Sequence, residues 1–378
     1  MINAQRLLIA RNRRKMSVSM LSSGSGVPIR ALRDIEAGGA ADEIVTRALA
    51  EALEFPVEFF SGDDIDLATG SQVSFRGLKS MTKKVREAME AAGGMAQLVN
   101  TWASSAFSLP SCNVPDLSGM EPEEAAQAVR EEWGLGLMSI RNMIHVLEAN
   151  GVRVFSITEE SRDVDAFSFY RDGIPFVLMN TQKSAARGRH DAAHELGHLV
   201  LHRNSDSVSD AAEHEADRFA SAFLMPSTTM IGIRSGFHVR DLVKLKSRWN
   251  VSVASLNYRL HSIGAIDAIQ YRDNCIEISR LGWRSSEPED RPREKSLIWE
   301  KILSKMRDKS MSIEDVCMAT GLSSHDIRSF AFGMVIMSAE DVSGDMRSLI
   351  RPQRGEGFVR LATVSGKATP SSFASQTK

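Results

Sequence analysis

The chain has 378 residues, of which 43% are hydrophobic and 25% are charged. This length predicts two or three domains with hydrophobic cores of their own, and the composition excludes a peptide hormone, a lone coiled coil and a disordered regulator. Lys and Arg number 46 against 48 Asp and Glu, which gives a net charge of −2. The overall charge therefore does not indicate a nucleic-acid-binding protein, and any basic surface must be local.

The cysteines and the apolar runs indicate the compartment. The three cysteines, Cys112, Cys275 and Cys317, are far apart and do not form a disulfide framework. The N-terminus lacks the uninterrupted apolar core of a secretory signal, and no run approaches the ~20 apolar residues of a membrane span. We therefore expect a cytoplasmic protein that makes no contact with a membrane.

The first 62 residues are predicted to form a small helical domain. Residues 1–35 contain seven Lys or Arg residues but only one acidic residue, Asp34, so this segment carries a charge of +6. Such an excess favours an anionic partner. The apolar spacing predicts a helix that ends near Lys15, a second helix capped by Ser17, a third over residues 29–36 and a fourth capped by Asp42.

Two stretches of this domain carry a specific pattern: MSVSMLSSGSGVPIRALRDIEAG at 16–38 and LAEALEFPVEFF at 49–60. They resemble the Xre/Cro-type helix-turn-helix DNA-binding domain, over residues 1–62. The resemblance implies that residues 28–33 enter the major groove, where Ile29, Arg30 and Arg33 contact DNA. Val18 replaces a glutamine that touches the DNA backbone in the family, and Ser25 replaces a core leucine. The alternative is a helical bundle that only joins two copies into a homodimer.

The middle of the chain alternates helical and β-rich patterns. Residues 63–80 are polar and contain Gly and Ser, which predicts an interdomain linker. Helical patterns follow over residues 81–106, from Glu121 and over residues 139–148. We expect the next three β-rich segments to form a small antiparallel sheet; they are residues 152–157, 166–170 and 175–180.

The strongest chemical signal is the sequence His194-Glu195-Leu196-Gly197-His198. Two histidines at positions i and i+4 of a helix lie on one face about one turn apart, so both imidazoles can reach one metal ion. Zinc is the metal that this pattern favours, and Glu195 borders the same site as a candidate catalytic base. His190 and His202 extend the same stripe. Because four turns of a straight helix cannot converge on one ion, we expect His190 and His202 to lie at the helix ends or beside the ligands and not to bind the metal themselves.

A catalytic zinc site needs a third protein ligand, and we predict Glu213 for this role. Glu213 and Asp217 lie at i and i+4 of a second predicted helix, so one carboxylate can bind zinc while Asp217 accepts a hydrogen bond from a ligand histidine. Glu215 points away from Glu213 and is the alternative ligand. An exposed acidic helix face without a metal is the remaining interpretation. The small residues Ala216 and Ala220 would let the two helices approach closely.

The metal motifs, ARGRHDAAHELGHLVLH at 186–202 and EHEADRFASAFLMP at 213–226, resemble the ImmA/IrrE family of zinc peptidases. The likeness covers roughly residues 1–285, and His190 stands where the family commonly has an aromatic residue. It implies a zincin-like metallopeptidase domain at 81–230, of the gluzincin-like HExxH type, followed by a helical segment at 231–285.

The family resemblance implies a zinc-dependent, site-specific endopeptidase that cleaves a partner repressor of Xre/Cro type and so controls stress or mobile-element genes. Zinc would polarise the scissile carbonyl and acidify water, and Glu195 would move the proton. An extended substrate would pair with residues 166–170 or 175–180, and Tyr170, His202 and His214 are candidates to stabilise the oxyanion. The alternatives are a transcriptional regulator whose zinc-peptidase-like domain senses a signal without cleaving, and a structural interaction protein.

The remainder of the chain is less informative. Residues 286–354 are expected to form a C-terminal helical region, in which a structural bundle is favoured over a second DNA reader because the last helix offers only Arg328. Residues 355–378 are small and polar, which predicts a disordered tail. The whole sequence thus predicts a mostly helical α+β protein.

Overall fold

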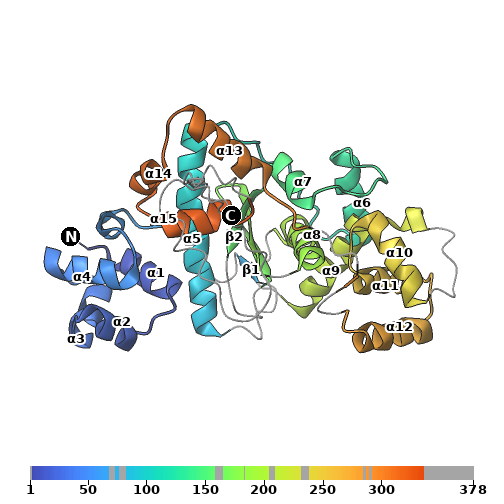
Figure 1. The fold of residues 1–378 in the computed structure, drawn as a ribbon, viewed down its shortest axis with the longest axis horizontal. Coiled ribbons are helices and arrows are strands. Elements are labelled where there is room, and N and C mark those ends of the chain that lie inside the picture. Colours follow the sequence, from blue (N-terminus) through green and yellow to red (C-terminus); the bar gives the residue numbers. More distant parts are fainter. Residues whose placement is uncertain are drawn as a thin grey trace, which may run out of the picture. The chain divides into compact units, whose positions relative to one another are not determined.

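The computed structural model describes residues 2–67, 73–75, 82–157, 165–182, 184–203, 209–230, 238–283, 287–288 and 292–335. These residues contain fifteen α-helices and one four-stranded sheet, so the protein is a mostly helical α+β structure, as predicted (Figure 1). All of them belong to one unit of the chain, which ends at Val335. The expected disordered tail lies outside the described residues.

Short helices form the N-terminal part of the chain, and they begin at the predicted caps. The side chains of Ser17 and Asp42 accept hydrogen bonds from the backbone N–H groups of Met20 and Val45. The predicted positions of the four helices are confirmed, and a 3-10 helix follows them. The elements are α1 (Ala4–Arg13), α2 (Val18–Ser25), α3 (Ile29–Glu36), α4 (Glu43–Leu53) and η1 (Val57–Ser61).

Several basic residues of this segment bind the protein itself. Arg6 donates to two backbone carbonyl groups, and Arg11 donates to Glu36 at 2.5 Å. Arg14 donates to both carboxylate oxygens of Asp326, each at 2.9 Å. The charge of +6 in the sequence therefore overstates the positive charge that a partner would meet.

The segment predicted to be a linker contributes to the fold where it is described. Ile65 is buried, and its N–H donates to Oε1 of Gln5 at 2.6 Å. Residues Val73–Phe75 form strand β1, which pairs antiparallel with β3 (Ala166–Arg171). Three extended residues within a polar stretch give too short a pattern to be recognised from the sequence, because strand periodicity needs about four or more residues.

The sheet contains the three predicted β segments, as β2 (Arg153–Ile157), β3 and β4 (Ile174–Asn180), in the order β1-β3-β4-β2. β3 and β4 form an antiparallel hairpin with the two-residue turn Asp172-Gly173, where both φ angles are positive. β2 runs parallel to β4, so the prediction of a purely antiparallel sheet is wrong. β4 lies between β2 and β3. It runs antiparallel to β3, to which the hairpin joins it, and parallel to β2.

The two faces of the sheet are covered by different helices, α5 (Lys83–Ala106) and α8 (Ala185–Leu201) (Figure 1). Side chains alternate along β3. Phe169 lies against α5, where a Cβ atom on Gly93 would be 3.2 Å from its ring. Ser168 and Tyr170 point the other way, and their hydroxyl groups bond to α8. Two hydroxyl groups of β3 therefore face α8.

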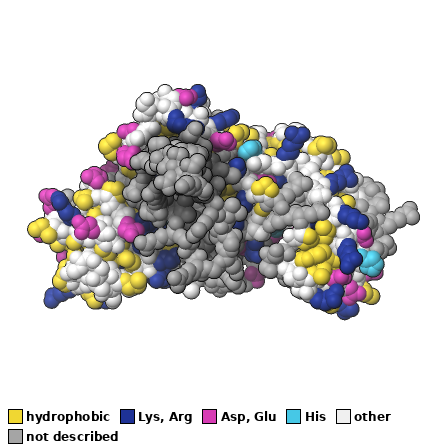
Figure 2. Space-filling view, in the orientation of Figure 1, with side chains coloured by type: hydrophobic (Ala, Val, Ile, Leu, Met, Phe, Trp, Pro, Cys, Tyr) yellow, Lys and Arg dark blue, Asp and Glu magenta, His cyan; other side chains and the backbone are white. Residues whose placement is uncertain are grey.

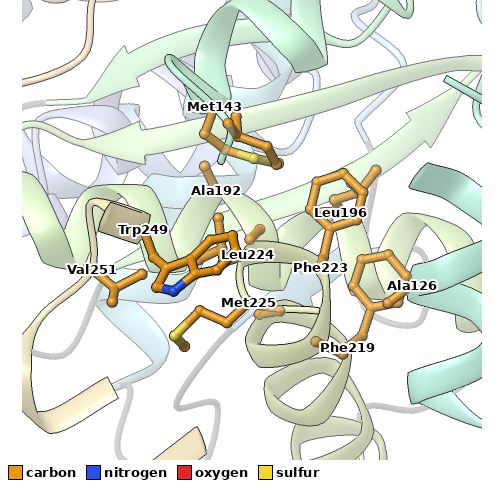
Figure 3. Close-up of a cluster of buried hydrophobic side chains, with 14 of the residues drawn as sticks. Ala126, Met143, Ala192, Leu196, Phe219, Phe223, Leu224, Met225, Trp249 and Val251 are labelled. Atoms are coloured by element: carbon orange, nitrogen blue, oxygen red, sulfur yellow. The ribbon is translucent and has the colours of Figure 1, made fainter. Parts of the chain in front are cut away.

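A hydrophobic core joins α8 to α6 (Pro122–Glu132), α7 (Met143–Ala149), α9 (Asp210–Leu224) and α10 (Val239–Trp249). Figure 3 shows Leu196, Phe219, Phe223 and Trp249 within it. α8 and α9 approach most closely at Gly197, where an added Cβ would lie 3.1 Å from the Cα of Ala216. The small residues thus bring the two helices together, as expected from Ala216.

The rest of the described chain is helical. The predicted C-terminal helical region is present up to Val335, and none of the described helices has the length and apolar character needed to cross a membrane. The elements are the 3-10 helix η3 (Ser227–Met230), α11 (Val253–Ser262), α12 (Ala268–Arg280), α13 (Leu297–Asp308), α14 (Ile313–Thr320), α15 (Ser324–Ile327) and the π-helix η4 (Arg328–Phe332).

Candidate metal centre

Three predicted ligands converge between α8 and α9. His194 and His198 project from α8 and Glu213 projects from α9, and the ligand atoms of the three lie within 4.8 Å of one another. The two imidazole Nε2 atoms are 3.1 Å apart, and each is 3.4 Å from an oxygen of Glu213. Metal bonds of about 2.0–2.1 Å at tetrahedral angles place neighbouring donors roughly 3.3 Å apart. The spacing therefore fits a zinc ion.

Local sequence explains why these side chains meet. Ser184 caps α8 by accepting from the N–H of Arg187, and Ser209 caps α9 by accepting from the N–H of Ala212. The spacing of four residues puts both histidines on the face of α8 that meets α9. The contact at Gly197 and Ala216 brings the helices close enough for Glu213 to reach that face.

The ionisation of the cluster also suits a cation. Burial lowers the pKa of His198 to about 4, so the imidazole is neutral at neutral pH and has a free lone pair. Burial opposes ionisation of Glu213, but its contacts with the imidazoles of His194 and His198 outweigh burial and lower the pKa of Glu213 to about 2. Neutral imidazoles and an ionised carboxylate are the forms that bind a metal.

Two further carboxylates orient the histidines. Oδ1 of Asp217 lies 2.8 Å from Nδ1 of His194, so the Nδ1–H of His194 donates to it and Nε2 is left for a metal. Oε2 of Glu215 lies 2.8 Å from Nε2 of His202, whose Nδ1 is 3.1 Å from Nδ1 of His198. Asp217 thus lies where it was predicted, and Glu215 contacts His202 instead of the three-residue cluster.

Sequence reasoning missed a residue that contacts the candidate catalytic base. The hydroxyl of Ser168 donates to Oε2 of Glu195 at 2.6 Å, and both residues are buried. The sequence contains a signal for this contact. Ser168 stands between Phe167 and Phe169 in a β-rich segment, so alternation places it on the face opposite the two rings. A lone polar residue on a buried face needs a partner.

The three residues proposed to stabilise the oxyanion lie in different surroundings. The hydroxyl of Tyr170 donates to the carbonyl oxygen of Leu199 at 3.1 Å, and burial raises the pKa of Tyr170. His202 lies beside His198, whereas His214 is exposed on α9. Tyr170 and His202 are therefore partly buried and contact residues of α8, whereas His214 is exposed to solvent.

The strands predicted to bind substrate are interior strands. β3 is flanked by β1 and β4, and β4 is flanked by β3 and β2. An edge is needed to pair with an extended peptide. The expectation that residues 166–170 or 175–180 offer that edge is wrong, because β1, which was not anticipated, covers β3, and β2 pairs with the other side of β4.

The predicted DNA-contacting residues lie on α3, away from the cluster. Ile29, Arg30 and Arg33 are exposed, and the described residues offer neither arginine a side-chain hydrogen bond or ion pair. On the face drawn in Figure 2, acidic and basic side chains are mixed over the N-terminal helices. The exposed positive charge of α3 is therefore local.

Residues 147–261 match the peptidase M78 family model, described as the IrrE N-terminal-like domain. No curated protein matches the chain. The matched segment begins in α7 and ends in α11, and it includes the sheet strands β2 to β4 and both helices that carry the cluster. Residues 147–261 therefore form an IrrE N-terminal-like domain of the peptidase M78 family, with a candidate metal site at His194, His198 and Glu213.

Proposed function

We propose that the protein is a zinc-dependent endopeptidase. The observation that supports this most strongly is the spacing of two imidazoles and one carboxylate at 3.1–3.4 Å, within a peptidase-family domain. His194, His198 and Glu213 would hold the zinc ion, and an His₂Glu donor set leaves one position open, as catalytic zinc sites require.

The residues of the chain suit the proton transfers of peptide hydrolysis. When bound, zinc supplies Lewis acidity toward a peptide carbonyl. Glu195 removes a proton from the attacking water and delivers it to the leaving nitrogen, so water is consumed, the C–N bond breaks and an acid and an amine are released. Ser168 donates a hydrogen bond to one oxygen of Glu195 and so fixes the position of the carboxylate. A sensor without catalysis would not need this base, so the intact Glu195 favours hydrolysis.

We further propose that the substrate is a transcriptional repressor of the Xre/Cro type and that the N-terminal helices tether the peptidase to DNA. The substrate class rests on the resemblance of the metal motifs to the ImmA/IrrE family. The tether rests on the sequence resemblance of residues 1–62 and on the exposure of Arg30 and Arg33 on α3. Guanidinium groups in such positions pair with phosphate oxygens or guanine. Cleavage of the repressor would relieve repression of stress or mobile-element genes.

The test compares wild type with Glu195→Gln on purified transcriptional repressors of the Xre/Cro type. We expect both proteins to carry one zinc per chain by metal analysis, and only the wild type to cleave. Glu124→Gln is the matched control, because it makes the same chemical change at an exposed position of α6 outside the site, and it should still cleave. Equal cleavage by wild type and Glu195→Gln would remove Glu195 from the proposed role, and a chain without bound zinc would contradict the metal assignment.

A further inference from the structure

A cavity of about 400 Å³ lies at the start of α8. It is bordered by Ala185, Ala186 and Arg189 of α8, by the end of α10 and by the segment that precedes α13. None of the three metal-cluster residues or Glu195 lines it. Its volume falls within the range of small-molecule sites, roughly 300–1,000 Å³.

The lining of this cavity is strongly basic. Five Lys or Arg residues border it against two carboxylates, Glu294 and Glu300, in a protein whose net charge is −2. Three of the basic groups are guanidinium groups, which pair with the oxygens of phosphate in a fixed fork. The five are Arg141, Arg189, Lys246, Arg293 and Lys295.

The lining keeps an excess of positive charge, because Glu294 is bound inside the fold and the exposed Glu300 opposes three exposed basic residues, Arg141, Arg293 and Lys295. Glu294 binds Arg189 and also accepts a hydrogen bond from the N–H of Met143 at 2.7 Å. Its negative charge is therefore balanced by groups within the fold. Lys246 is paired at 2.8 Å with Glu287, which does not line the cavity. The charge that remains for a ligand therefore comes from other basic groups.

Arg141 and Lys295 supply that charge. Both are exposed, and the described part of the chain gives neither side chain a hydrogen bond or an ion pair. Arg189, by contrast, is almost fully buried, and its Nε has no hydrogen-bond partner in the structure. Two exposed cations and one buried guanidinium group thus border the same space.

We propose that this cavity binds a small phosphate-bearing molecule. The phosphate lies between Arg141 and Lys295, and the first N–H groups of the seventeen-residue helix α8 add positive potential from the side of Ala185 and Ala186. The remaining volume accommodates the organic part of the ligand. This binding does not depend on the proposed peptidase activity, so it holds or fails by itself.

Calorimetric titration of the full chain with pyrophosphate and with adenosine diphosphate tests the proposal. We expect saturable binding by wild type and an affinity at least tenfold weaker in the double variant Arg141→Ala, Lys295→Ala. The control is Lys83→Ala, Arg272→Ala, which removes the same charge at two exposed positions outside the cavity and should bind like wild type. Circular dichroism melting of all three proteins checks that each is folded.

Three outcomes overturn the proposal. Absence of binding to wild type at 5 mM pyrophosphate shows that the basic lining is only a solvated surface. Equal binding by wild type and the cavity variant places the anion elsewhere. A dicarboxylate or a DNA duplex that binds more tightly than both phosphate probes, and loses affinity in the same variant, assigns the cavity to another class of ligand.

Discussion

Ser168 on β3 and Glu195 on α8 share a hydrogen bond of 2.6 Å in a fully buried setting. A buried carboxylate can adopt several rotamers, and a short bond from a fixed strand selects one of them. Because the strand also presents Tyr170 to Leu199 of the same helix, β3 and α8 are linked at two successive positions of the same face. The sheet therefore orients the base as well as supporting the helix.

The first prediction follows from that contact. Ser168→Ala should lower kcat for repressor cleavage by about tenfold with little change in zinc content, because general-base catalysis depends on the position of the carboxylate. Ser168→Thr keeps the hydroxyl and should restore most of the rate. Cleavage kinetics with metal analysis provide the measurement. A loss of zinc in Ser168→Ala, or an equal loss of rate in Ser168→Thr, would mean that Ser168 acts through packing alone.

The candidate site was more predictable from the sequence than its surroundings. His194 and His198 follow from helix geometry alone, and Glu213 from the same geometry applied to a second helix. Contacts between segments that are distant in the sequence could not be predicted from helix geometry. The Ser168–Glu195 bond depends on how a strand faces a helix, and the parallel pairing of β2 with β4 depends on the path of the connection between strands. The pairing of Arg14 with Asp326 joins residues 312 positions apart, which no local pattern encodes.

The second prediction separates the two candidate carboxylate ligands. Glu213→Ala should abolish zinc binding, whereas Glu215→Ala should retain it, because Glu215 contacts His202 and lies outside the cluster. Asp217→Asn should weaken zinc affinity by about 10- to 100-fold, since it removes the charge that orients His194. Competition with a chromogenic chelator measures all three affinities. Retention of tight binding by Glu213→Ala would disprove the assigned ligand set.

The third prediction concerns the contact between α8 and α9. Gly197→Ala should destabilise the protein and weaken zinc binding, because the new Cβ would lie 3.1–3.2 Å from backbone atoms of Ala216, which cannot move without separating the helices. Gly188→Ala is the matched control on the same helix, since its Cβ meets nothing within 4 Å. That variant should gain up to about 1 kcal/mol from helix propensity. Urea denaturation distinguishes them, and equal effects would contradict the close approach.

The fourth prediction concerns pH. Burial raises the pKa of Glu148 from 4.5 to about 6, against hydrogen bonds from Ser296, Ile298 and Leu297. A carboxyl with a raised pKa in the folded state stabilises the fold fully below its unfolded pKa, and this contribution is lost as the pH rises through the folded pKa. The loss between pH 4.5 and pH 7 is about 2 kcal/mol of unfolding free energy. Glu148→Gln does not titrate, so its unfolding free energy relative to wild type should rise by that amount over this interval. Urea denaturation at several pH values measures both unfolding free energies. If the difference between wild type and Glu148→Gln is the same at every pH, Glu148 ionises normally.

The fifth prediction tests the proposed tether to DNA. Arg30 and Arg33 are exposed on α3, whereas Arg6, Arg11 and Arg14 are held by internal contacts, so Arg30 and Arg33 are better placed than these three to neutralise phosphates. The slope of log affinity against log salt should fall by about 2 in the Arg30→Ala, Arg33→Ala variant if each contacts one phosphate. Lys83→Ala, Arg272→Ala removes equal charge elsewhere and should keep the wild-type slope. Fluorescence anisotropy with a labelled DNA duplex, measured over a range of salt concentrations, gives both slopes. If the two double variants bind equally, α3 does not contact DNA and the N-terminal helices serve another purpose, such as contact with a second copy of the chain.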